Sequence, residues 1–262
     1  MTIPALSLHF DLHTLHCTIP PAASHRFGHP YMWLVFFKAD GSTITITNEF
    51  LADGNVELHF PSGRQGNLGK RSNLVSKQMI AMPDHISEWR TVLHPFRIPY
   101  FEEDIPSVCG VAAVMLEANN VSEVGIEAAH QAVAKYARKA AVQIIDELRP
   151  TDIQLLNIVP SLQTYFVGKL EQHGSRLIEV VKDAIIGSQS IIQNIQSWWK
   201  RDELIGYDFR LFTQYSFNEQ IHQPATTHTH TFTLTFHDPR NPERGKWELE
   251  GSIVSTPQQQ GS

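Results

Sequence analysis

The chain has 262 residues, which is enough for one large domain or two small ones with a well-buried core. Hydrophobic residues make up 42% of the sequence and charged residues 18%, and the formal net charge of −6 argues against nucleic-acid binding, because that binding depends on Lys and Arg. No apolar run is long enough to span a bilayer, and the first residues lack the features of a secretory signal, so we expect a cytoplasmic protein.

The first 120 residues show the patterns of strands and turns. Strands are predicted at residues 5–19, 31–39, 43–47, 56–60 and 108–117. The first alternates apolar and polar residues, which indicates a half-buried strand. Asp40-Gly41 predicts a hairpin turn that connects the second of these strands to the third. Cys17 and Cys109 fall within predicted strands, so we expect both to be reduced core thiols.

Between residues 121 and 200 the spacing of apolar residues changes to that of a helix. Apolar residues recur three and four positions apart from Ile126 to Leu148, and again from Leu162 to Trp199. Ser122 is a suitable N-cap for the first helix, and Pro150 ends it. The segment is therefore predicted to form an antiparallel α-helical hairpin.

After the helical segment the strand pattern returns, at residues 204–212, 226–236 and 246–255. Three strands alone could not easily bury both faces of a sheet, whereas together with the earlier strands they can form one sandwich. We therefore predict an α+β fold in which an antiparallel β-sandwich (residues 1–120 and 201–255) carries residues 121–200 as an inserted helical hairpin. The polar residues 256–262 are expected to form a disordered tail.

Two short motifs outside the insertion resemble C2 domains, which are antiparallel β-sandwiches often used to dock on membranes or proteins. Residues 29–31 (His-Pro-Tyr) precede an apolar strand and are similar to that family's Asp-Pro-Tyr strand start. Residues 202–206 (Asp-Glu-Leu-Ile-Gly) are similar to its Asp-Asp-x-Ile-Gly turn. The strand at 111–117 with Asn119 would lead into that turn after a few residues, but here the helical segment separates them. The resemblance implies a C2-like sandwich.

Calcium-binding C2 domains hold the ion with aspartates on their apical loops. In this chain His29 stands where the first loop has an aspartate, Glu117 and Asn119 stand where two more would be, and Asp202 alone matches directly. Because Ca²⁺ requires several oxygen ligands, calcium binding is not expected, and we predict no cofactor. Glu117, Asn119 and Asp202 mark the loop base of the insertion, where a functional site would most naturally lie.

Three histidines near the C-terminal strands are candidate ligands of a transition metal. His228 and His230 lie on one face of a predicted strand, and His222 is close in sequence. Two imidazoles at this spacing can share a metal ion, although solvated histidines at an exposed strand end are the alternative. No nucleophile elbow, Cys-x-x-Cys pair, His-Glu-x-x-His helix or dinucleotide-binding motif is present, so the motifs do not identify an enzyme.

The predicted hairpin ends in Trp198, Trp199, Lys200 and Arg201, which places aromatic side chains beside basic ones. This composition suits a membrane interface, where Trp lies at headgroup depth and cations meet anionic lipid. The polar face of the hairpin nevertheless mixes acidic and basic residues. The alternatives are that the hairpin packs on the sandwich or on a second copy, or that it lines a ligand pocket.

Together these features favour a non-catalytic interaction module. In this hypothesis a C2-like sandwich uses its helical insertion to dock a protein partner, a second copy of itself or a membrane surface, and nucleic acid is not a partner. One alternative is a pore-forming or toxin-like effector whose hairpin inserts into a membrane. A further alternative is a metal-dependent enzyme that uses the histidine cluster.

Overall fold

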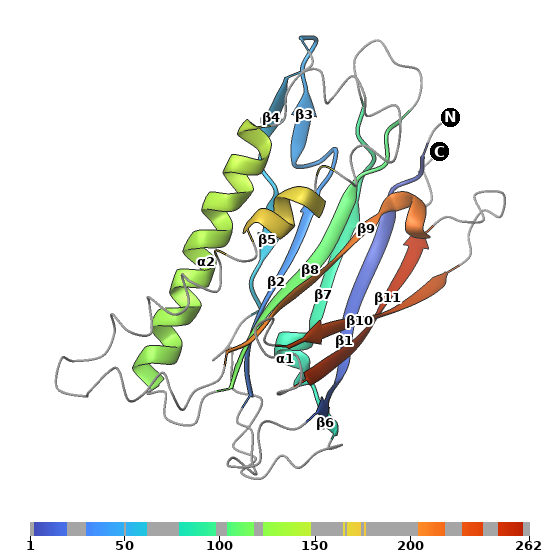
Figure 1. The fold of residues 1–262 in the computed structure, drawn as a ribbon. Helices are drawn as coiled ribbons and strands as arrows, with labels where there is room; N and C mark the ends of the chain where they lie inside the picture. Colours follow the sequence, from blue (N-terminus) through green and yellow to red (C-terminus); the bar gives the residue numbers. More distant parts are fainter. Residues whose placement is uncertain are drawn as a thin grey trace.

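The computed structural model describes most of the β-rich parts of the chain and part of its helical region. The described residues are 3–19, 30–49, 51–61, 79–97, 104–117, 123–147, 165, 167–173, 176, 204–217, 227–237 and 246–258. Within them the protein consists mostly of antiparallel β-sheets with few helices, which makes it a sheet-rich α+β protein (Figure 1). Among the helices described, none is long and apolar enough to cross a membrane.

The first sheet has five strands and is organised around the long strand β1. Its strands are β1 (Leu6–Ile19), β6 (Met79–Ala81), β7 (Glu88–Leu93), β10 (His228–Phe236) and β11 (Lys246–Pro257). β1 pairs along its length with β11, and β11 pairs in turn with β10. β6 and β7, which are connected by the short helix α1 (Asp84–Ser87), also pair with β1. β11 extends beyond the end expected from the sequence, because Thr256 and Pro257 still pair with β1.

The second sheet has four strands in the order β5-β2-β8-β9. Its strands are β2 (Pro30–Ala39), β5 (Glu57–His59), β8 (Val108–Glu117) and β9 (Leu204–Thr213), and β9 is followed by a 3-10 turn, η2 (Gln214–Phe217). β8 and β9 pair directly, from Val108 opposite Thr213 to Leu116 opposite Leu204. The long segment between these two strands therefore leaves and re-enters the sheet at one end.

The two sheets face each other across the main hydrophobic core. Alternate residues of β1 point into this core, as the sequence predicts, and are buried between partly exposed neighbours. Phe10 of β1 packs against Phe36 of β2 and Trp89 of β7, with ring centroids 5.6 and 5.3 Å apart. Cys17 and Cys109 are buried and form no disulfide, which confirms the prediction of reduced core thiols. Burial raises the pKa of the Cys109 thiol, so it stays protonated.

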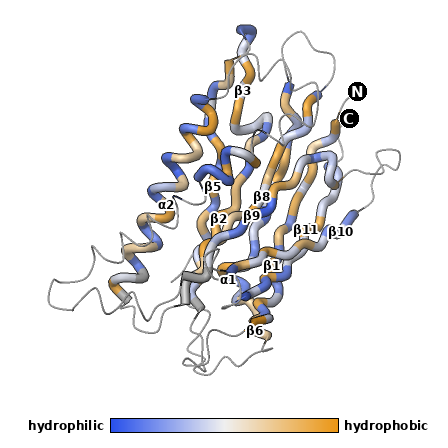
Figure 2. The backbone as a smooth tube through the Cα atoms, viewed as in Figure 1, coloured by the Kyte–Doolittle hydropathy of each residue, from blue (hydrophilic) through white to orange (hydrophobic). Residues whose placement is uncertain are grey.

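The opposite face of the second sheet is covered by the helix α2 (Glu123–Asp146), so that three layers follow one another in Figure 1. Trp33 and Val35 of β2 pack against Ala129 and Val133 of α2. β2 thus buries both of its faces, which explains its apolar run from Met32 to Phe37. Figure 2 shows the corresponding alternation of hydrophilic and hydrophobic residues along α2.

The bounds of α2 confirm the first predicted helix, which was expected to begin after Ser122 and to end before Pro150. Of the second predicted helix, residues 165, 167–173 and 176 are helical, and the remainder lies outside the described residues.

The prediction that Asp40-Gly41 connects two paired strands was wrong. The chain does turn there, since the Ile44 backbone N–H donates to the Asp40 carbonyl at 2.9 Å. However, β3 (Ile44–Ile46) pairs with β4 (Ala52–Gly54), and β5 takes the place beside β2. The buried Asp40 carboxylate accepts hydrogen bonds from the backbone N–H groups of Ser42 and His94. These bonds anchor the turn to the end of β7 and direct the chain away from β2.

Candidate functional site

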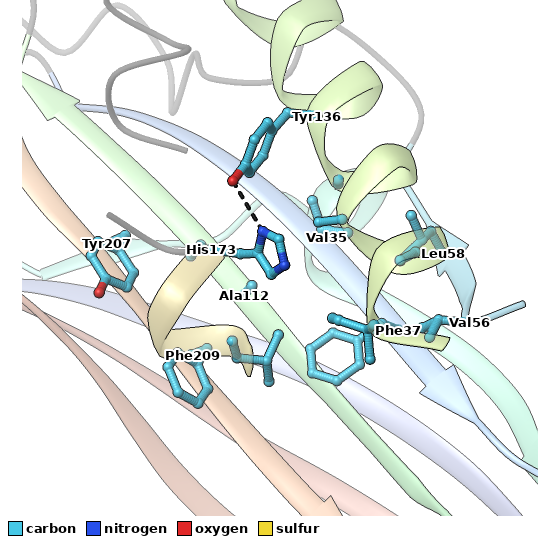
Figure 3. A pocket seen from close by; sticks show the side chains of 15 residues that line it. Val35, Phe37, Val56, Leu58, Ala112, Tyr136, His173, Tyr207 and Phe209 are labelled. Carbon is cyan, nitrogen blue, oxygen red and sulfur yellow. Dashed lines mark hydrogen bonds between the residues drawn. The ribbon is translucent and has the colours of Figure 1, made fainter. Parts of the chain in front are cut away.

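A cavity of about 80 Å³ lies between the outer face of the second sheet, α2 and the helical residues 167–173 (Figure 3). Four strands supply its floor, through side chains such as Val35, Phe37, Leu58 and Phe209. α2 supplies most of the opposite wall. The cavity is thus part of the interface between the helical layer and the sheet.

The cavity exists because small side chains stand where the helix and the sheet approach each other. α2 contributes Ala137, Ala140 and Ala141 to the lining, and β8 contributes Ala112 and Ala113. Alanine side chains are too short to fill the space between a helix and a sheet, whereas interiors elsewhere are close-packed. Alanine has the highest helix propensity, so these residues stabilise α2. Because their side chains are short, they also leave space between α2 and the sheet.

The polar side chains among the lining residues are Tyr136 of α2, His173 and Tyr207 of β9. The Tyr136 hydroxyl and His173 Nδ1 are 3.1 Å apart and share a hydrogen bond, and their rings meet edge to face. The side chain of His173 is 8% exposed, and Figure 3 shows its ring between Tyr136 and the sheet residues Ala112 and Phe37. One edge of an otherwise apolar pocket thus carries a pair of hydrogen-bonding groups.

His173 is a neutral imidazole at neutral pH. Burial lowers its pKa, and the positive charges of Arg176 and Lys169 act in the same direction, while the Glu147 carboxylate opposes them. Glu147 itself forms an ion pair with Lys169, and the hydrogen bond from Lys169 lowers the pKa of Glu147. The site therefore presents an uncharged hydrogen-bonding group to the pocket.

The second helical stretch is held on the end of α2 by specific contacts. The Tyr165 hydroxyl donates to the Ile144 carbonyl at 2.7 Å, and Lys169 pairs with Glu147. Tyr165 and Leu170 also pack against the cluster formed by Phe37 of β2 and residues of α2. These contacts position His173 over the cavity.

The arrangement is suited to binding and offers little for catalysis. Its lining residues include no carboxylate, thiol or serine hydroxyl that His173 could activate, so the described part of the pocket provides no nucleophile. It provides a small apolar volume with one hydrogen-bonding edge, which is the usual composition of a small-molecule site.

The histidines predicted as metal ligands occupy a different place. His228 and His230 lie at the start of β10 and continue the inward face of Phe232, so both are half-buried rather than fully solvated. The His230 ring packs edge to face on Phe217 at 5.2 Å. No group of three metal-binding side chains occurs in the described part of the chain, and His222 lies outside it. Because side chains alternate between the two faces of a strand, His228 and His230 share a face with the apolar Phe232. This pattern could have predicted that both histidines lie at the edge of the core.

The remaining predicted site residues lie mostly outside the described residues. These are Trp198, Trp199, Lys200, Arg201, Asn119 and Asp202. Glu117 is the last residue of β8, where its backbone pairs with Pro30. The sequence did not identify Tyr136 or His173, because neither belongs to a motif and the two are 37 residues apart.

On the solvent side of the first sheet, Ser252, His13 and Asp11 have the order of a nucleophile, a base and an orienting carboxylate. His13 Nε2 is 2.8 Å from Ser252 Oγ, and His13 Nδ1 is 3.3 Å from the Asp11 carboxylate. Acyl transfer also requires hydrogen-bond donors for the oxyanion. Ser252 lies on β11, which pairs with β1 on one side and β10 on the other, so the backbone N–H groups around it are used in the ladders. We therefore do not interpret this contact as an active site.

Comparison with known proteins finds no protein-family model that matches the chain, and no curated protein that matches it with significant similarity.

Proposed function

We propose that this protein is a non-catalytic binding module, a C2-like β-sandwich whose inserted helical hairpin closes a binding pocket against one sheet. Two features of the fold support this architecture. The two sheets share one hydrophobic core, and the helices follow β8 and precede β9, which are neighbours in the second sheet. The helical segment can thus be an insertion at one end of a continuous β domain.

The observation that carries the proposed function is the apolar cavity beneath α2. An unfilled cavity of about 80 Å³ with apolar walls forgoes the free energy of contacts with those walls. An apolar group that enters the cavity recovers part of that free energy through contacts with its walls. A preformed, concave and mostly apolar site with one polar edge is typical of ligand binding.

Docking of a protein partner, a second copy or a membrane surface through the insertion stays a prediction. The apolar stripe of α2 is packed on the sheet, with Ala129 and Val133 fully buried. Two apolar side chains on α2, Val124 and Val142, are exposed at 66% and 45% and are available for such a contact. The pocket is the better-supported site because its walls are already formed.

Toluene, an apolar probe, tests the proposal in protein labelled with ¹³C at the alanine methyl groups. Toluene should shift the NMR signals of Ala112, Ala137 and Ala140 saturably and leave that of Ala81, in the first sheet, unchanged. Ala140→Leu should abolish the shifts by filling the cavity. The matched variant Ala132→Leu, at a position of α2 that does not line the cavity, should preserve them. Pocket signals that do not respond to toluene would refute the proposal.

A further inference from the structure

We infer that the ligand of this pocket is a compact, neutral, apolar molecule with a single hydroxyl group, such as a phenol or a short branched alcohol, bound through His173. The inference rests on the proposed function and adds the chemical class of the ligand. It follows from three properties of the site: the position of its polar atoms, its charge and its size.

Among the described residues, Nε2 of His173 is a hydrogen-bonding atom of the pocket that is open to a ligand. The Tyr136 hydroxyl occupies Nδ1 at 3.1 Å, whereas Nε2 has no hydrogen-bond partner within the described part of the chain. His173 as a whole residue is 8% exposed. A ligand that reaches Nε2 adds a hydrogen bond to its apolar contacts and so gains affinity. The other walls near it, from Phe37 to Ala140, offer only apolar surface.

The hydrogen bond between Tyr136 and His173 can have either group as its donor, and a ligand hydroxyl can pair with Nε2 in both cases. When Tyr136 donates to Nδ1, Nε2 carries the imidazole proton and requires an acceptor. When Nδ1 carries the proton and donates to Tyr136, Nε2 requires a donor. A hydroxyl both donates and accepts, whereas a carbonyl or an ammonium group satisfies one arrangement only.

The charges around the pocket favour a neutral ligand. Lys169 is already paired with Glu147, and the lining residues include neither an acidic nor a basic side chain other than the neutral His173. A charged group buried against apolar walls without a partner is strongly disfavoured. Carboxylates and amines in their charged forms are thereby excluded.

The size of the cavity requires a compact ligand. A volume of about 80 Å³ is roughly six times the space that one water molecule requires, and the pocket is partly open. A long acyl chain does not fit, whereas a six-membered ring fits when it extends toward the open side. Phe37, Phe209 and Tyr207 line the site, and aromatic rings pack well against one another edge to face.

Phenol and toluene form a matched pair that tests the inference on the full chain, because they differ only by a hydroxyl in place of a methyl group. Both should bind the wild-type pocket, as seen from the alanine methyl signals. His173→Phe keeps a ring at that position but removes the hydrogen bond. It should weaken phenol binding about ten-fold or more and leave toluene binding within about two-fold. The same titrations of Ala132→Leu, which does not line the pocket, should match the wild type for both probes.

The ring signals of His173 give a second measurement that does not depend on a variant. Phenol should shift the His173 imidazole resonances, and toluene should shift them much less. If toluene binds but phenol binding does not depend on His173, the ligand class is wrong and the proposed function stands. If neither probe reaches the pocket, both the ligand class and the proposed function are wrong.

Discussion

The two faces of β2 have been packed in different ways. On the inner face, Phe36 meets the rings of Phe10 and Trp89 in a layer built from large side chains. On the outer face, the neighbouring Phe37 meets α2 across a layer of alanines that leaves a cavity. β2 therefore contributes one face to a closely packed core and the other face to a binding pocket. The inner layer supplies stability, whereas the outer layer gives up some stability to keep space.

The largest effect is expected when the inner layer is broken. Phe36→Ala should destabilise the protein by about 4 kcal/mol, because it removes a fully buried ring and leaves a large cavity. Chemical denaturation would measure the change. A loss below about 2 kcal/mol would show that the inner layer does not carry the stability assigned to it.

The matched change on the outer face should cost less. Phe37→Ala removes the same side chain one residue further along β2, but this ring already borders a cavity and so loses fewer contacts. We expect a loss of about 2 kcal/mol in the same denaturation experiment. Equal losses for the two phenylalanines would remove the distinction between the layers.

Adding atoms should destabilise the inner layer more than the outer layer. Gly251→Ala, on β11, would place its Cβ 2.7 Å from Leu12 and 2.8 Å from Phe232, so overpacking should destabilise the protein by about 2 kcal/mol. Ala140→Leu fills the outer cavity and should change stability by less than about 1 kcal/mol. If Ala140→Leu proved the more damaging change, the space beneath α2 would not be available to a ligand.

Acid should loosen the outer layer first. An unfolded histidine titrates near 6.5, and burial lowers the pKa of His173 below that value. The folded protein therefore binds fewer protons than the unfolded chain between these two pKa values, so the contribution of His173 to stability is present above pH 6.5 and is lost as pH falls. The groups that face His173 are Tyr136 of α2, Glu147, Lys169 and Arg176.

Amide hydrogen exchange, corrected for its intrinsic pH dependence, would measure this effect. Protection of α2 should fall between pH 7.5 and 5.5, while β1 and β11 remain protected. His173→Phe should reduce the loss, and His130 of α2, whose pKa burial also lowers, should account for part of the remainder. A fall in protection shared equally by both sheets would contradict an origin in the helical layer.

The smallest effect concerns Gly168, in the second helical stretch. A Cβ added there meets no atom within 4 Å, so alanine can be accommodated without displacement. Gly168→Ala should stabilise the protein by about 0.5–1 kcal/mol through helix propensity, as measured by thermal unfolding. A destabilised variant would indicate that the described helix does not persist in solution.

Much of the fold could be predicted from local patterns. The alternation of residues 5–19 and the apolar run at 31–39 predicted β1 and β2, and the helical spacing after Ser122 predicted α2. Each of these patterns reflects which face of one element is buried, and that information is local. The pairing of β3 with β4 could not be predicted in this way, because it depends on the distant anchor between Asp40 and His94.

The pocket could not be predicted for a related reason. Ala137 and Ala140 indicate a stable helix, but whether they meet a neighbour or leave a gap depends on how far α2 lies from the sheet. His173 belongs to no sequence motif, and its function in the site depends on Tyr136 on another helix. A run of alanines on the buried face of a helix is the one sequence signal that could have suggested space.

Crystals of the protein pressurised with xenon would test the central claim most directly. Xenon enters small apolar cavities without requiring a hydrogen bond. The account predicts a xenon atom between α2 and the second sheet, in contact with Ala140 and Phe37, and none between the two sheets beside Phe10 and Phe36. Xenon in the inner core, or an outer layer that excludes it, would contradict the claim that this protein keeps a binding pocket beneath its helix.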